Sequence, residues 1–247
     1  MAELKHIDRG DGVQLACSHV PGSGPTLVFL PGYMSDMQGT KGLALEAFAT
    51  RTGRALLRLD YSGCGQSGGR FEDGSIRRWA GDALAVIEAV TPGPLILIGS
   101  SMGGWIMLHV ALALGQRVQA LVGIAAAPDF TRWGLQLDAG DIARLLESGS
   151  VSRGSAYGPE PYLYCRALLD DAQGACVLDA EIGIDCPVRL LHGQLDADVP
   201  FDISLRLAAR LRSADVQTIL VKSGDHRLSS PADLDLLFHT LEGLLVS

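Results

Sequence analysis

Short apolar runs alternate with longer segments of helical spacing along most of the chain. Runs of β-branched and leucine residues predict strands, and apolar residues that recur every three or four positions predict helices with one buried face. In segment 76–90, for example, Trp79, Ala83 and Val90 share one helical face. The predicted strands are residues 13–20 (antiparallel), 27–30, 55–59, 95–98, 118–125, 188–191 and 216–221, and the predicted helices are residues 76–90, 102–114, 203–211 and 234–245.

The alternation stops between residues 129 and 185, where the chain is polar and rich in glycine and serine. Short helical patterns occur there only near 141–147 and 161–170. A segment of this length exceeds an ordinary connection, which indicates a lid or cap. Because strand–helix alternation calls for a parallel sheet covered by helices on both faces, we predict one α/β domain over residues 1–247 with a lid insertion at roughly 129–185.

One uncharged stretch, between Glu88 and Arg117, is long enough to cross a bilayer. Pro92-Gly93-Pro94 interrupts it near its start, and the small residues that follow position 99 divide it again. These breaks favour a buried strand followed by a buried helix over a membrane span.

The composition narrows the class of protein further. In 247 residues, 47% are apolar and 30 are glycine, which suits one large aliphatic core with many tight turns. A net charge of −8 does not favour a nucleic acid or an anionic membrane as partner. The five cysteines form no CxxC pair, so neither a zinc site nor a disulfide framework is predicted. With no signal or transit pattern at the N-terminus, we expect a cytoplasmic protein.

The sharpest chemical motif is Gly99-Ser100-Ser101-Met102-Gly103, which follows one predicted strand and precedes a predicted helix. A serine in such a G-x-S-x-G turn is held in a strained backbone conformation, and small neighbours allow the turn to close. Its hydroxyl is then exposed beside the N–H groups of the helix N-terminus. Ser101 is the predicted nucleophile, and a turn that serves only strand–helix packing is the alternative.

A serine hydroxyl needs a general base, and the base needs a carboxylate to orient it. Of the six histidines, His226 lies on a polar loop after the last predicted strand, from which it can reach the same sheet edge as Ser101. It is the predicted base. The others are interpreted as structural or surface residues, including His192, for which packing or fixing of a loop is expected.

Three aspartates compete for the role of the orienting acid. Asp196 follows the penultimate predicted strand and completes the order Ser…Asp…His, so we favour it. Asp198 lies two residues further from the strand and is better placed to brace the helix that begins after Pro200. Asp129, just beyond strand 118–125, is the remaining alternative.

The turn Leu30-Pro31-Gly32-Tyr33 predicts the second half of an oxyanion hole. Placed after a buried strand, it would present the Tyr33 N–H opposite the Met102 N–H. Only backbone donors are needed, so an ordinary turn is the alternative.

A second glycine motif is a false match. The run Gly63-Cys64-Gly65-Gln66-Ser67-Gly68 satisfies G-x-G-x-x-G after a strand, as a dinucleotide site would. A polar segment, residues 69–74, follows where a helix should begin, and the next acid lies on a predicted helix. We therefore predict no dinucleotide site.

Together these motifs resemble the α/β-hydrolase superfamily over essentially the whole chain. The matching segments are Leu30-Pro31-Gly32, residues 60–67, residues 99–104, His192-Gly193 with Asp196 and Val199-Pro200, and Asp225-His226. More narrowly, residues 31–33 with 39–41, residues 99–105 and Asp225-His226-Arg227 resemble the mitochondrial palmitoyl-protein thioesterases and acyl-glucuronide esterases of the α/β-hydrolase-domain family and their bacterial relatives. The resemblance implies a mostly parallel eight-stranded sheet and a triad of Ser101, Asp196 and His226.

The expected function is hydrolysis of a carboxylic ester or thioester, on a small molecule or a protein, through an acyl-enzyme. Water would then release the acyl group, with neither metal nor cofactor required. Ser100, Trp105, Trp133 and Tyr157 are candidate pocket residues. Cleavage of peptide or carbon–carbon bonds on the same fold, or a non-catalytic binding module, are the alternatives.

Overall fold

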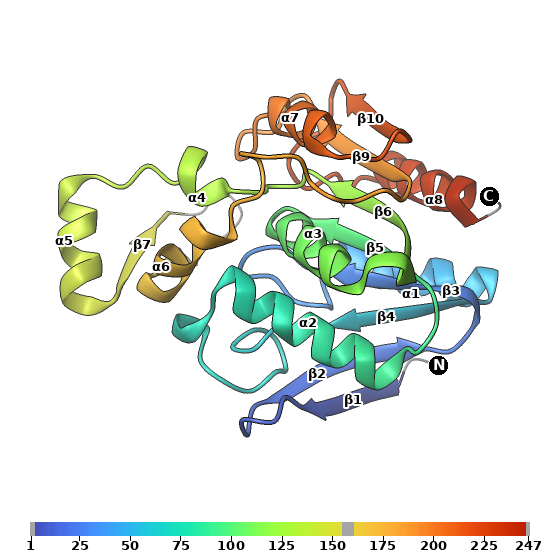
Figure 1. The fold of residues 1–247 in the computed structure, drawn as a ribbon, viewed down its shortest axis with the longest axis horizontal. Helices are drawn as coiled ribbons and strands as arrows, with labels where there is room; N and C mark the ends of the chain where they lie inside the picture. Colours follow the sequence, from blue (N-terminus) through green and yellow to red (C-terminus); the bar gives the residue numbers. More distant parts are fainter. Residues whose placement is uncertain (1–2, 155–160, 246–247) are drawn as a thin grey trace.

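The computed structural model describes residues 3–154 and 161–245 and has a large, strongly twisted sheet at its centre (Figure 1). Its strands lie in the order β1-β2-β4-β3-β5-β6-β9-β10. Strand β2 runs antiparallel to both β1 and β4, and every other neighbouring pair is parallel. The predicted mostly parallel sheet of eight strands is thus confirmed. The bounds are β1 Glu3–Asp8, β2 Gln14–Val20, β3 Ser23–Leu30, β4 Arg54–Leu59, β5 Leu95–Ser100, β6 Val118–Ile124, β9 Val188–Gly193 and β10 Val216–Val221.

Helices cover both faces of this sheet because its central strands are apolar on both sides. Leu27 and Phe29 of β3 pack in one buried cluster with residues of α1 and α8. The alternate residues Val28 and Leu30 belong to the other cluster, with α2, α3 and Leu207 of α7. Two cores therefore lie on opposite faces of one sheet. These helices are α1 Thr40–Thr52, α2 Ile76–Val90, α3 Met102–Leu114, α7 Asp202–Arg210 and α8 Pro231–Leu245.

Helix α1 is absent from the elements that the sequence pattern predicts. Its buried positions, Gly42, Leu45, Phe48 and Ala49, have helical spacing, but the stripe begins with a glycine. A β-carbon on Gly42 would lie 2.3 Å from the carbonyl oxygen of Met37, so close packing requires glycine there. That requirement weakens the apolar signal of the helix.

The uncharged stretch between residues 88 and 117 folds as strand β5 followed by helix α3, as expected. Every residue of β5 is buried, as are nine of the thirteen residues of α3. In the described part of the chain, no helix combines the length and the apolar character that crossing a bilayer would need.

The predicted insertion, residues 129–185, projects from one end of the sheet (Figure 1). Its described elements are α4 Phe130–Trp133, α5 Ala139–Ser148, β7 Ser150–Arg153, β8 Tyr162–Cys165 and α6 Arg166–Ala175. The helical pattern predicted near 141–147 is confirmed within α5. The one predicted over 161–170 is wrong at its start, because Tyr162–Cys165 pairs with β7 and the helix begins only at Arg166. Alternating Tyr-Leu-Tyr residues favour an extended strand there.

Candidate active site

Ser101 occupies a strained turn between strand β5 and helix α3. Its φ and ψ are 54° and −122°, a backbone conformation that residues other than glycine rarely adopt. Its N–H donates to the carbonyl of Ile124 at 2.9 Å, and its carbonyl accepts from Ala127 at 3.0 Å, so the turn is tied to β6. A β-carbon on Gly103 would lie 2.1 Å from the Leu30 carbonyl oxygen, which explains the small residue there. Ser101 therefore lies in a strained and closely packed turn between a strand and a helix.

Three loops bring Ser101, His226 and Asp196 together at the carboxyl edge of the sheet. Asp196 follows β9 and His226 follows β10, so adjacent parallel strands deliver both side chains to one edge. His226 Nε2 lies 3.1 Å from Ser101 Oγ, and its Nδ1 lies 2.8 Å from Asp196 Oδ2. Because a carboxylate only accepts, Nδ1 carries the proton, and Nε2 is left to accept from the serine hydroxyl.

The Asp196 side chain is wholly buried and yet held as an anion. Burial alone would raise its pKa, but hydrogen bonds from His192, His226 and the Val199 N–H hold the pKa well below its usual range. Its Oδ1 also accepts from the Asp198 N–H at 2.9 Å. The carboxylate is therefore ionised and fixed in place at neutral pH.

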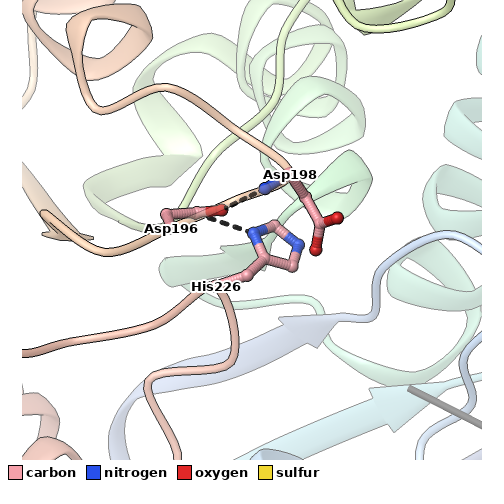
Figure 2. A group of neighbouring side chains, drawn as sticks. All are labelled: Asp196, Asp198 and His226. Atoms are coloured by element: carbon pink, nitrogen blue, oxygen red, sulfur yellow. Dashed lines mark hydrogen bonds and ion pairs between the residues drawn. The ribbon is translucent and has the colours of Figure 1, made fainter. Parts of the chain in front are cut away.

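The two alternative acids have different surroundings. Asp129 is buried and accepts the N–H groups of Val177 and Leu178, each at 2.9 Å, so it holds the end of the insertion against the core. Asp198 is exposed beside His226, while the Nδ1 bond of that ring goes to Asp196 (Figure 2). Asp196 is thus the candidate whose carboxylate accepts from His226 Nδ1.

A cation site was not predicted. Among the described residues, one cluster of side chains could nevertheless hold a metal ion. One ligand atom each from Asp196, Asp198 and His226 lies within 4.8 Å of the others (Figure 2). The facing atoms of Asp196 and His226 already bond to each other, however, so this arrangement favours proton transfer.

The turn predicted to complete an oxyanion hole lies directly against Ser101. A β-carbon on Gly32 would be 3.3 Å from Ser101 Cβ and 3.9 Å from its Oγ. The Met102 N–H is the first of α3, so it has no acceptor within that helix. No backbone carbonyl of the described residues accepts the Tyr33 N–H. Donation from both groups to one oxyanion stays a prediction.

The side chains of this turn also hold the insertion. The Tyr33 hydroxyl donates to the carbonyl of Leu163 in strand β8, and the N–H of the same Leu163 lies 3.2 Å from Met34 Sδ. The Tyr33 ring stacks on Tyr164 with centroids 5.4 Å apart. Strand β8 is thus anchored on the residues that follow β3.

A cavity of about 640 Å³ opens onto Ser101 and His226. Of the predicted pocket residues, Ser100 and Trp133 line it. Trp105 does not: it is fully buried and its indole N–H donates to the carbonyl of Ala175, because its side of α3 faces the core and α6. Tyr157 lies outside the described residues.

An aromatic wall that the sequence pattern did not predict lines the same cavity. Tyr33, Phe130, Tyr162 and Tyr164 all border it, and the Tyr33 ring lies against each of the other three. The Tyr-Leu-Tyr alternation at 162–164 was the available signal, since alternate residues of a strand share one face.

Lys41, in the first turn of α1, is a further cavity residue whose role the sequence did not show. Its ammonium donates to the carbonyl of Arg227 and lies 3.4 Å from Ser229 Oγ, so it braces the loop that carries His226. Burial lowers the pKa of Lys41 to about 8.

Comparison with known proteins identifies the family. A family model described as the alpha/beta hydrolase fold matches residues 25–146. The mitochondrial palmitoyl-protein thioesterase ABHD10 of Homo sapiens is 39% identical over 244 residues, which cover 98% of this chain and 80% of that protein. The chain is a member of the α/β-hydrolase family.

Solved structures of other α/β hydrolases agree closely with this fold. A putative hydrolase from Agrobacterium vitis superposes with a TM-score of 0.93 at 39% identity, covering 99% of this chain and 98% of that one. Alpha/beta hydrolase domain-containing protein 10 from mouse gives 0.90 at 39% identity, covering 98% of each chain. The fold and the family that the sequence motifs implied are thereby confirmed.

Proposed function

We propose that this α/β hydrolase is a serine hydrolase that cleaves carboxylic esters or thioesters. The supporting observation is the continuous chain of hydrogen bonds from Ser101 Oγ to His226 Nε2, at 3.1 Å, and from His226 Nδ1 to Asp196, at 2.8 Å. A nucleophile (Ser101), a general base (His226) and an orienting carboxylate (Asp196) are thus hydrogen-bonded in the sequence that acyl transfer requires. The nucleophile, the base and the orienting carboxylate of this mechanism all come from the chain itself.

In the first half-reaction, Ser101 Oγ attacks the acyl carbon while His226 Nε2 takes the hydroxyl proton. The resulting imidazolium is stabilised by the Asp196 carboxylate, which does not itself accept the proton. When the tetrahedral intermediate collapses, the carbon–oxygen or carbon–sulfur bond breaks and His226 protonates the departing alcohol or thiol. Ser101 is left as an acyl ester.

In the second half-reaction, water takes the place of the leaving group. His226 accepts a proton from that water as its oxygen attacks the acyl carbon, and returns the proton to Ser101 Oγ when the acid departs. In both halves, the N–H groups of Tyr33 and Met102 would stabilise the negative oxygen, the latter with the positive end of the α3 dipole.

The cavity indicates how the acyl group would bind. Its aromatic wall, built from Tyr33, Phe130, Tyr162 and Tyr164, offers apolar surface beside Ser101. We infer that the insertion acts as a lid that supplies most of this wall for the acyl chain. The name of the human relative, palmitoyl-protein thioesterase, supports an acyl thioester as one substrate class.

The deciding experiment is covalent labelling with a fluorophosphonate probe, which reacts with activated serines. Wild-type protein should be labelled, Ser101→Ala should not, and Ser100→Ala, which removes the adjacent hydroxyl, should keep the label. Absence of labelling in folded wild-type protein would overturn the proposal and favour a binding module. A panel of p-nitrophenyl esters, acyl-CoA thioesters and aminoacyl amides then separates ester and thioester hydrolysis from peptide cleavage.

A further inference from the structure

A second histidine, His192, also lies against the carboxylate that orients His226. It sits in strand β9 with no exposed surface. Its Nε2 is 3.1 Å from Asp196 Oδ2 and 2.9 Å from the carbonyl oxygen of Val199. Its Nδ1 is 2.7 Å from Ser204 Oγ, in helix α7. Both ring nitrogens are therefore engaged, one of them with the carboxylate.

The partners of the ring decide where its proton lies. The Val199 carbonyl can only accept, so His192 Nε2 carries the hydrogen, which bonds to Val199 and lies close to Asp196 Oδ2. The Nδ1 atom then accepts from the Ser204 hydroxyl. Consequently, Oδ2 of Asp196 lies 2.8 Å from Nδ1 of His226 and 3.1 Å from the protonated Nε2 of His192.

We propose that His192 is a positioning residue that holds Asp196 Oδ2 toward His226 and moderates how strongly this oxygen attracts the His226 proton. The inference rests on the proposed function, since it assigns His192 a role in the same hydrogen-bond chain. An oxygen that already accepts one N–H has less electron density for a second. With the His192 donor removed, Asp196 would stabilise the His226 imidazolium more strongly and would also lose one of its restraints.

Other charged groups lie near His226, since Lys41, Asp198 and Arg227 line the same cavity. His192 faces Asp196, Val199 and Ser204. His226 faces Ser101, Asp196 and the exposed carboxylate of Asp198. Since Asp198 is left untouched by a change at His192, a shift of the pH profile in a His192 variant reports on Asp196.

The test compares two substitutions that keep different halves of the imidazole. His192→Gln can place an amide N–H where Nε2 stood, whereas His192→Asn reaches only the Nδ1 position and leaves Asp196 without this donor. We expect His192→Asn to lower kcat about tenfold with KM changed less than twofold, the loss typical of one hydrogen bond to a charged group. The acid limb of its kcat/KM profile should move up by about 0.5 pH unit. His192→Gln should restore most of kcat and the wild-type limb.

A packing control separates positioning from stability. Leu207→Ala removes a buried side chain of α7 but no group that bonds to His192 or Asp196, and should lower the melting temperature while the acid limb stays in place. The proposal is overturned if His192→Asn keeps the wild-type limb and kcat, or if His192→Gln is as impaired as His192→Asn. Should His192→Asn not fold, His192→Gln is decisive: a kcat more than fivefold below wild type in folded protein refutes the role. Fluorophosphonate labelling of wild-type protein is measured first, because its absence refutes the proposed function instead.

Discussion

The predicted oxyanion hole can be tested at Gly32, without removing any catalytic group. In Gly32→Ala, the added methyl group would lie 3.3 Å from both the Ser100 carbonyl oxygen and Ser101 Cβ, and 3.9 Å from Ser101 Oγ. These contacts are tight by a few tenths of an ångström, so the turn must move away from Ser101. Because Tyr33 is the next residue, its N–H moves with the turn.

The expected magnitudes for stability and for catalysis differ widely. The slight overpacking caused by the added methyl group lowers the unfolding free energy by about 1–3 kcal/mol, which a folded domain tolerates. A misplaced oxyanion donor costs about 2.7–4 kcal/mol of transition-state stabilisation, which corresponds to a fall in kcat of about 100- to 1000-fold. We expect KM to change little, because the donor acts mainly on the tetrahedral intermediate.

The assay measures kcat and KM with a p-nitrophenyl ester and the melting temperature of the same preparations. Gly68→Ala is the matched control, since a β-carbon there would make only ordinary contacts, 3.5 Å and 3.6 Å from backbone atoms of Gln14, outside the cavity. A folded Gly32→Ala protein with kcat within threefold of wild type would refute the placement of the oxyanion hole at this turn.

Three further substitutions test the acid, the histidine loop and the insertion. Asp129→Asn should lower the unfolding free energy by about 1.5–3 kcal/mol, because it weakens two backbone hydrogen bonds, and should keep the wild-type kcat. Urea titration measures the first effect and an ester assay the second. Loss of turnover in Asp129→Asn would transfer the acid role from Asp196 to Asp129. The charged hydrogen bond from Lys41 to the Arg227 carbonyl is present below pH 8 and is lost as the pH rises through about 8. The kcat of the wild-type protein should therefore decline as the pH rises through about 8. Lys41→Met should have a lower kcat than wild type at pH 7 and should show no such decline. Asp141→Asn leaves two arginines without their buried partner, which should lower the melting temperature and raise KM for long acyl esters more than for acetate esters.

The main fold was predictable because its signals are local. The apolar runs of β3, β5 and β6 are buried on both faces, and such runs are distinctive in sequence. Ser101, Asp196 and His226 were predicted from their places just after strands, and parallel strands bring such positions to one edge. For that reason, the large separation of these three residues along the chain did not prevent the prediction.

The remaining features depend on contacts between distant segments. Lys41 and Arg227 are 186 residues apart, and neither forms part of a spacing pattern. Trp105 was a predicted pocket residue, but the side of α3 on which it lies is decided by packing against the insertion. His192 resembled a packing residue because its bond to Asp196 requires the loop after β9 to turn back on its strand.

The anchoring of strand β8 has a consequence for how this enzyme could be re-engineered. Both backbone groups of Leu163 bond to side chains of Tyr33 and Met34, which belong to the core domain. The insertion is therefore not a separable module: a graft from a relative would have to bring compatible residues at 33 and 34. Exchanging those two residues would in turn disturb the turn whose backbone faces Ser101. We therefore expect substrate range and turnover to depend on this one dipeptide, and directed evolution of either to return paired changes in residues 33–34 and 162–164.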